Sequence, residues 1–236
     1  EMNLTLRRIL QLFILALLMM PPVSCETGGD KTDANPFHIQ LNITADSTIV
    51  CLGDSLTYGD GADSPPAESY PWWLQDMVDL EVVNSGESGN TSGDALAHVQ
   101  EDVLDHNPVI VIVELGANDY LNDLDPETTL DNLEAIINSC RASGAVVFLC
   151  RFFSDEMADE YSQSDPDGVE TLITMYASLA ERERVFLVED IWGDIRETPG
   201  FMDDAAHPSG EGYQVMAQMI FEAMREMLEY NDIALP

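Results

Sequence analysis

Hydrophobic and polar positions follow two patterns along this chain, and these patterns predict strands and helices in turn. Short apolar runs that are rich in β-branched residues and bounded by turn-forming residues are typical of buried strands. Such runs occupy residues 48–52, 80–84, 109–115, 145–150 and 185–188. The run at 109–115 is apolar almost throughout, which favours a central parallel strand covered on both faces.

The segments between these runs predict helices that connect the strands. We expect helices over residues 70–79, 94–106, 125–144 and 169–183, and a closing helix over 213–228 whose apolar residues recur at helical spacing. Strands that alternate with helices predict a parallel sheet. The expected fold class is therefore α/β, a three-layer α/β/α sandwich with a parallel sheet of about five strands.

The N-terminal segment has the layout of a signal peptide. Two arginines precede an apolar run over residues 9–20, which is too short to span a bilayer comfortably. We therefore expect residues 1–25 to be a signal peptide, residues 26–46 to be a linker, and residues 47–236 to form one domain. The mature protein is expected to be exported, to the periplasm or the cell surface.

Cys25 leaves two interpretations of the leader open. It follows the small residue Ser24 and lies where a bacterial lipoprotein carries its lipidated cysteine, although Pro22 is atypical three positions upstream. One interpretation is membrane attachment through a lipid on Cys25, and the other is simple cleavage nearby.

The charge of the chain limits its partners. Nine Lys and Arg residues stand against 44 Asp and Glu residues, for a formal net charge of -35. Such a surface repels phosphate backbones and anionic headgroups, so we expect no nucleic-acid partner. An acidic coat suited to a salty or exported setting explains the charge without any acid-specific chemistry.

The remaining cysteines predict neither a disulfide framework nor a metal site. Cys51, Cys140 and Cys150 lie in or beside apolar runs, which suits buried free thiols. The chain has no C-x-x-C spacing, and its four histidines are scattered. We therefore expect neither a structural metal nor a cofactor.

The first candidate for chemistry is Ser55. It follows the run at 48–52 through Gly53 and Asp54, so it would lie just beyond the carboxyl end of a strand, where open α/β sheets bind ligands. Because Gly, Asp and Ser all favour turns, this segment taken alone is equally well explained as a simple turn. Asp54 is expected to bond within its own loop.

A carboxylate and an imidazole near the C-terminus change this balance. Asp204 and His207 are three residues apart, so the acid can accept from one ring nitrogen while the other faces a serine. A serine hydroxyl needs such a base to become a nucleophile. Asp203 is the competing acid, but only Asp204 has the three-residue spacing. The G-x-S-x-G motif is absent because position 57 is Thr.

Four short polar blocks follow one another along the chain. They are Gly53-Asp54-Ser55-Leu56, Gly89-Asn90-Thr91, Gly116-Ala117-Asn118-Asp119 and the segment from Asp204 to His207. In these blocks and their order the sequence resembles the SGNH hydrolases, also called GDSL esterases and lipases. The resemblance covers roughly residues 47–230 and is nearest to exported bacterial thioesterases, arylesterases and lysophospholipases. It implies a flavodoxin-like sheet.

The resemblance also implies a role for each site residue. Ser55 would attack the acyl carbonyl, His207 would take its proton, and Asp204 would orient His207. The backbone N–H groups of Ser55 and Gly89, with the Asn118 side-chain amide, would form the oxyanion hole.

The expected function is hydrolysis of carboxylic esters or thioesters of small acyl substrates by a monomeric serine esterase. Two alternatives remain open. The same residues could deacetylate carbohydrates, because the family also acts on acyl esters of sugars. The chain could also be a surface protein that binds lipid or glycan and has kept the fold without turnover.

Overall fold

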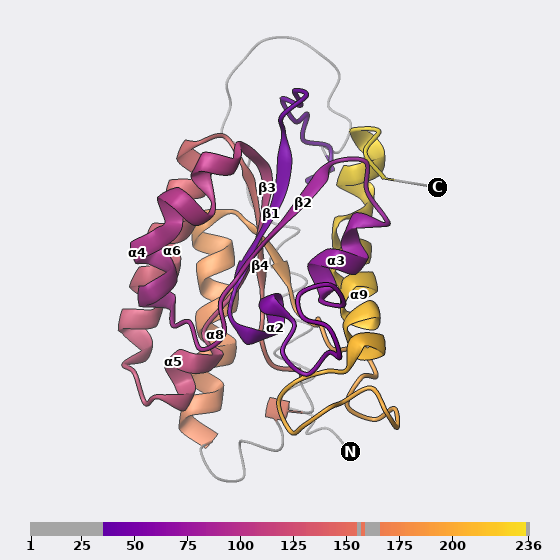
Figure 1. Ribbon diagram of the computed structural model, residues 1–236. Coiled ribbons are helices and arrows are strands. Elements are labelled where there is room, and N and C mark those ends of the chain that lie inside the picture. Colours follow the sequence, from indigo (N-terminus) through magenta and orange to yellow (C-terminus); the bar gives the residue numbers. More distant parts are fainter. Residues whose placement is uncertain (1–34, 155–156, 159–165, 235–236) are drawn as a thin grey trace. The chain divides into compact units, whose positions relative to one another are not determined.

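The computed structural model describes residues 35–154, 157–158 and 166–234 (Figure 1). The expected signal peptide and the first part of the expected linker lie outside the described residues. The described helices and strands belong to one compact unit, Pro36–Pro236.

A single sheet of five parallel strands forms the centre of this unit (Figure 1). The strands run in the order β2-β1-β3-β4-β5, which is the flavodoxin-like order. The expected fold class is therefore confirmed, and each strand lies within two residues of its expected bounds. The strands are β1 (Thr48–Gly53), β2 (Glu81–Gly86), β3 (Pro108–Glu114), β4 (Val146–Cys150) and β5 (Phe186–Val188).

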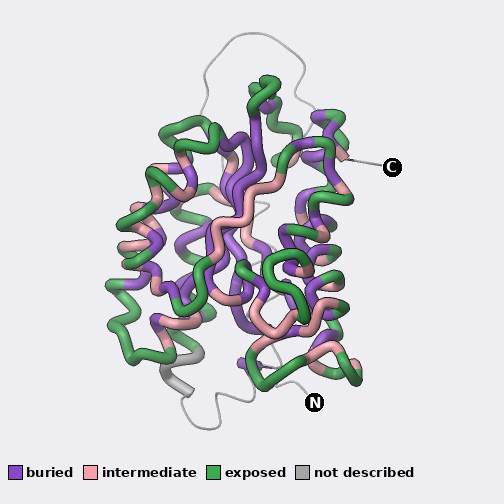
Figure 2. The backbone as a smooth tube through the Cα atoms, in the orientation of Figure 1, coloured by how far each residue is buried: buried purple, intermediate pink, exposed green. Residues whose placement is uncertain are grey.

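Helices cover both faces of the sheet. Figure 1 shows α4 (Ser92–Asp102), α6 (Pro126–Ala142) and α8 (Pro166–Glu183) on one face, and α3 (Tyr70–Gln75) and α9 (Gly210–Tyr230) on the other. Two of the three inner strands, β1 and β3, are buried along their whole length, and Figure 2 shows them between helices whose outer sides are exposed. Within the described part of the chain, every helix is too short or too polar to span a bilayer.

The closing helix α9 supplies much of the core on its side of the sheet. Its residues Met216, Ile220 and Met224 have no exposed surface and recur at helical spacing. Full burial of such a side chain contributes about 1.5–3 kcal/mol. Three free cysteines, Cys51, Cys140 and Cys150, are buried as expected.

Two helices end earlier than their apolar patterns predict. Helix α3 ends at Gln75 rather than near residue 79, because Val78 forms an isolated bridge with Ala234. Helix α4 ends at Asp102, and the expected remainder is a separate 3₁₀ turn, Leu104–His106.

Two short helices, α2 (Ser55–Tyr58) and α5 (Ala117–Leu121), are absent from the sequence-based prediction. Each follows one of the inner strands, β1 or β3, after one to two residues. Four or five residues are too few to show a helical period, so the sequence pattern gives no signal for them. Helix α2 begins at Ser55, and α5 begins one residue before Asn118. Both of these residues are candidates for chemistry from the sequence.

The segment 36–46, expected to be part of a linker, contacts the end of α9. The Asn231 side chain accepts from the backbone N–H of Leu41 at 2.9 Å and donates to the carbonyl of Ile39 at 2.9 Å. Leu41 itself is buried. Hydrogen bonds between residues about 190 positions apart have no signature in local composition, so the sequence contains no sign of this contact. The expected domain boundary at residue 47 stays a prediction.

Candidate active site

The loop after β1 and the loop before α9 meet at the carboxyl edge of the sheet. Nε2 of His207 lies 3.0 Å from Oγ of Ser55, although the two residues are 152 positions apart in the chain. Both residues are only partly buried, so the pair is open to a substrate. The structure therefore brings together the serine and histidine that the sequence selected.

The imidazole of His207 is held from its other side by Asp204. Oδ2 of Asp204 lies 2.9 Å from Nδ1 of His207, while Oδ1 accepts from the backbone N–H groups of Ala206 and His207 at 2.7 and 2.8 Å. With Nδ1 donating to the carboxylate, Nε2 is left to accept from the Ser55 hydroxyl. Asp203 instead donates its backbone N–H to the carbonyl of His207 at 3.0 Å.

This geometry changes the acidity of Asp204. The hydrogen bond with the His207 side chain, aided by that from the backbone N–H of Ala206, lowers the pKa of Asp204 from 3.8 to about 2. The carboxylate of Asp204 is therefore ionised at every pH above about 2, including neutral pH, where it can stabilise a protonated imidazole.

The turn that carries Ser55 is shaped by the two residues before it. Asp54 caps α2, its Oδ1 accepting the backbone N–H of Leu56 at 3.0 Å. A side chain at Gly53 would lie 1.9 Å from Oγ1 of Thr57 and 2.6 Å from the carbonyl oxygen of Glu114, so only glycine fits there. The expected bond of Asp54 within its own loop is present.

Asn118 joins the loops that follow the first three strands. It lies at the start of α5, after β3, and its Nδ2 donates to Oδ2 of Asp54 at 3.1 Å and to the carbonyl oxygen of Asn90 at 2.9 Å. Both amide hydrogens thus have acceptors in the resting structure. Asp54 belongs to the turn after β1, and Asn90 to the loop after β2.

Gly89 lies in that second loop with a φ of +86°, which glycine adopts without strain. The space where its side chain would be is open. The loop is tied to the serine turn, because the N–H of Glu87 donates to the carbonyl of Gly53 at 3.2 Å.

Asp119 is a supporting residue to which the sequence assigned no role. It is 2% exposed, and Oδ2 accepts the backbone N–H of Ser92 at 2.8 Å while Oδ1 accepts the hydroxyl of Thr129 at 3.0 Å. These bonds tie the start of α5 to α4 and α6, next to Asn118. The signal in the sequence that could have identified Asp119 is its place in the block Gly116-Ala117-Asn118-Asp119.

A second carboxyl that the sequence missed is Glu114, the last residue of β3. It has no exposed surface, and burial raises its pKa well above the usual value. A single acid at the end of an otherwise apolar run, in a strand expected to be covered on both faces, was the signal for it.

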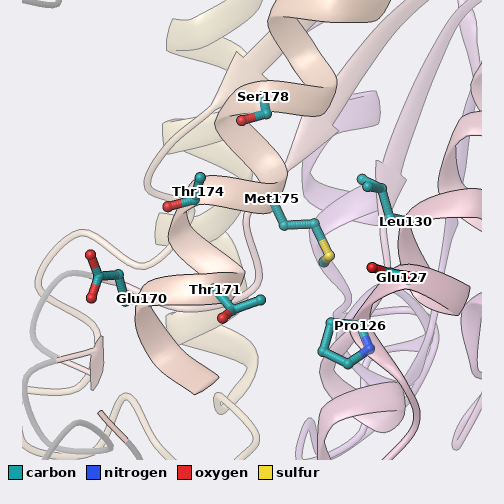
Figure 3. Close-up of a pocket in the computed structure, with 8 residues that line it drawn as sticks. All are labelled: Pro126, Glu127, Leu130, Glu170, Thr171, Thr174, Met175 and Ser178. Atoms are coloured by element: carbon teal, nitrogen blue, oxygen red, sulfur yellow. The ribbon is translucent and has the colours of Figure 1, made fainter. Parts of the chain in front are cut away.

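A separate cavity of about 530 Å³ lies between the N-terminal part of α6 and the middle of α8 (Figure 3). Its lining includes no residue predicted to take part in catalysis. The cavity is lined by Pro126, Glu127, Leu130, Glu170, Thr171, Thr174, Met175 and Ser178.

No group of His, Cys, Asp or Glu side chains in residues 35–154, 157–158 and 166–234 is arranged to hold a metal ion.

Comparison with known proteins identifies the family. The model of the GDSL-like lipase/acylhydrolase family matches residues 51–215, more than half of the chain. The chain belongs to this family. The family and the enzyme class expected from the sequence, a GDSL-type serine ester hydrolase, are thereby confirmed.

Relatives of this GDSL hydrolase match it over most of their length. An arylesterase of Vibrio mimicus is 30% identical over 186 residues, covering 76% of this chain and 89% of that protein. The thioesterase 1/protease 1/lysophospholipase L1 of Escherichia coli K12 is 27% identical over 196 residues, covering 82% and 90%. The crystal structure of esterase EstA from Pseudoalteromonas sp. shares the fold, with a TM-score of 0.68, 23% identity, and coverage of 77% and 98%.

The lowered pKa of Asp204 predicts a pH-dependent contribution to the stability of this GDSL hydrolase. Because the folded-state pKa of about 2 lies below the ordinary 3.8, the stabilisation is fully present above pH 3.8 and is lost as the pH falls through about 2. Asp204→Asn should therefore lower the urea midpoint near neutral pH, and this loss should shrink in acid.

Asp203→Asn is the matched control, because it removes the same charge from an acidic protein but leaves the partner of the imidazole in place. Urea unfolding of both variants at about pH 6 and about pH 2.5 measures the difference. Equal midpoints for the two variants at about pH 6 would contradict the prediction.

Proposed function

We propose that Ser55 is the nucleophile of this ester hydrolase, with His207 as its general base and Asp204 as the acid that orients the imidazole. The observation that supports this most strongly is the unbroken series of contacts, 3.0 Å from Ser55 to His207 and 2.9 Å from His207 to Asp204. In this mechanism His207 accepts the Ser55 proton as Oγ attacks the acyl carbonyl. It then returns the proton to the leaving group, and water repeats the cycle on the acyl-enzyme.

The proposed oxyanion hole consists of the backbone N–H groups of Ser55 and Gly89 and the side-chain amide of Asn118. The open side of Gly89 supports this role, because a substrate oxygen can approach its backbone closely. Asn118 supports it through its fixed position beside the serine turn, held by Asp54 and Asn90. The developing negative charge would compete with these two acceptors for the amide hydrogens.

We further propose carboxylic esters or thioesters of small acyl groups as substrates, and a monomer as the active form. Relatives named arylesterase and thioesterase 1/lysophospholipase L1 support this substrate class. The net charge of -35 disfavours strongly anionic substrates, because their approach is opposed electrostatically.

The substrate proposal predicts a pattern of activity across esters. Nitrophenyl esters of increasing acyl length, an acyl thioester and an acetylated sugar should be compared under one condition. Nitrophenyl esters and the thioester should be hydrolysed faster than the acetylated sugar. Activity confined to the sugar would favour a carbohydrate deacetylase, and inactivity on all of them would favour a binding protein.

The same panel should be run with Ser55→Ala as the control for contaminating hydrolases. Loss of a catalytic serine costs about 10⁴-fold or more in kcat, so this variant should be inactive on every ester. Hydrolysis that survives in Ser55→Ala would show that the measured activity does not come from this serine.

Asn118→Ala should lower kcat by about 10²- to 10³-fold with little change in KM, because one donor to an oxyanion contributes about 2.7–4 kcal/mol in the transition state. Asn122→Ala is the control. Its amide donates to the backbone carbonyl of Asn118 at 2.8 Å, so this variant disturbs the same helix and leaves the amide of Asn118 intact. Unchanged turnover in Asn118→Ala would remove this residue from the mechanism.

We also propose that the protein is exported to the periplasm or the cell surface, on the basis of the arginines and the apolar run that precede Cys25. Attachment through a lipid on Cys25 predicts incorporation of a labelled fatty acid into the wild type and none into Cys25→Ala. An unlabelled wild-type protein of shortened length would instead indicate simple cleavage.

A further inference from the structure

Two carboxyl groups lie together beneath the turn that carries Ser55. Glu114 is the last residue of β3 and is fully buried, and Asp54 follows β1 and is 1% exposed. The parallel register places Glu114 beside Gly53, the neighbour of Asp54. Each carboxyl acts on the pKa of the other, so the two lie within interaction distance. A hydrogen bond between them requires a proton on one member, because two ionised carboxylates have no donor.

The donors around the pair show which group holds the proton. Asp54 accepts from the backbone N–H of Leu56 at 3.0 Å and from the amide of Asn118 at 3.1 Å. Glu114 accepts at Oε2 from the hydroxyl of Thr57 at 3.3 Å, and the backbone N–H of Asp54 has the smallest effect among the groups that act on its pKa. The buried Oε1 of Glu114 has no hydrogen-bond donor. The ion pairs found in the described residues include neither carboxyl. A buried carboxylate needs donors, so the ionised member is Asp54 and the protonated member is Glu114.

The surroundings agree with this assignment. Burial raises the pKa of Glu114 well above its usual value and that of Asp54 to about 6. A charge on His207 lowers the pKa of Asp54 and so favours its ionisation, whereas the charge of Asp119 raises that pKa. Burial also raises the pKa of four nearby groups, which keeps them neutral: Cys51, Tyr70, Cys150 and Tyr176.

We propose that Glu114 is a positioning residue for ester hydrolysis: as a neutral acid it donates a hydrogen bond to the Asp54 carboxylate, and through it fixes the amide of Asn118 beside Ser55. This inference rests on the proposed role of Asn118 in the oxyanion hole.

The two oxygens of the Asp54 carboxylate have different partners, which makes the proposed coupling between Glu114 and Asn118 specific. Oδ1 accepts the N–H of Leu56 and so shapes the turn of the nucleophile, while Oδ2 accepts from Asn118. The hydroxyl of Glu114 fixes the rotation of this carboxylate about its own bond. Without it, the carboxylate can turn, and the amide moves relative to Ser55 by distances to which catalysis is sensitive. The effect should appear in kcat and hardly in KM.

Thr57 fixes Glu114 in turn. Its Oγ1 lies 3.1 Å from the hydroxyl of Tyr70 and donates its single hydrogen to Glu114, so the hydroxyl of Tyr70 must donate to Thr57. Tyr70 itself has no exposed surface. On this proposal a series of hydrogen bonds runs from the buried Tyr70, the first residue of α3, through Thr57, Glu114 and Asp54 to Asn118.

Glu114→Gln and Glu114→Leu test the proposal. Glutamine has nearly the same shape and keeps a donor for Asp54, so kcat should stay within about threefold of wild type. Leucine keeps similar volume without a donor, so kcat should fall by about tenfold to a hundredfold, with KM within about threefold. A large loss of kcat in Glu114→Gln would show that Glu114 acts as a charge, and an active Glu114→Leu would show that it acts only by packing. Either result would overturn the proposal.

Combination with Asn118→Ala gives a readout that a purely structural role would not change. If Glu114 acts through the amide, Glu114→Leu should cost at most about threefold more in the Asn118→Ala background. Independent, multiplying losses would overturn the coupling.

Infrared difference spectra of wild type against Glu114→Gln should also show the C=O stretch of a protonated carboxyl at neutral pH. Absence of this band would overturn the assignment even if Glu114→Leu does not fold. This band does not depend on turnover, so it separates failure of this inference from failure of the proposed function.

Discussion

The parallel order of the sheet is the constraint on which the site depends. Because all five strands run in one direction, the loops after β1, β2 and β3 leave the same edge, and these loops carry Ser55, Gly89 and Asn118. His207 arrives from the far end of the chain, 3.0 Å from Ser55. Neither residue could function in this way alone, since a serine hydroxyl is a weak nucleophile without its base.

The same edge concentrates buried carboxyl groups. Asp54, Glu114 and Asp119 are each at most 2% exposed, in a chain with 44 acids and nine bases. Hydrogen-bond donors on neighbouring loops contact all three, and the ion pairs found among the described residues include none of them. Such an arrangement contributes little net stability, because desolvation of a carboxylate offsets the hydrogen bonds it gains. Its value lies in fixed geometry at the reacting groups, where small displacements are costly.

Much of the fold follows from the sequence, and the reasons are local. Alternating apolar runs and helical periods identify all five strands, and the three-residue spacing of Asp204 and His207 implies their contact before any fold is known. The short helices α2 and α5 are too brief to have a period. The contact of residues 36–46 with Asn231, and the pairing of Glu114 with Asp54, depend on the order of strands in space, which no local pattern encodes.

The most direct test of this account is the site and rate of covalent labelling by a fluorophosphonate, which reacts with activated serines. Peptide mass spectrometry of the labelled wild type should place the phosphonyl group on Ser55, and the labelling rate should fall by about a thousandfold or more in His207→Ala. Labelling of a different serine, or an equal rate without the imidazole, would contradict the account.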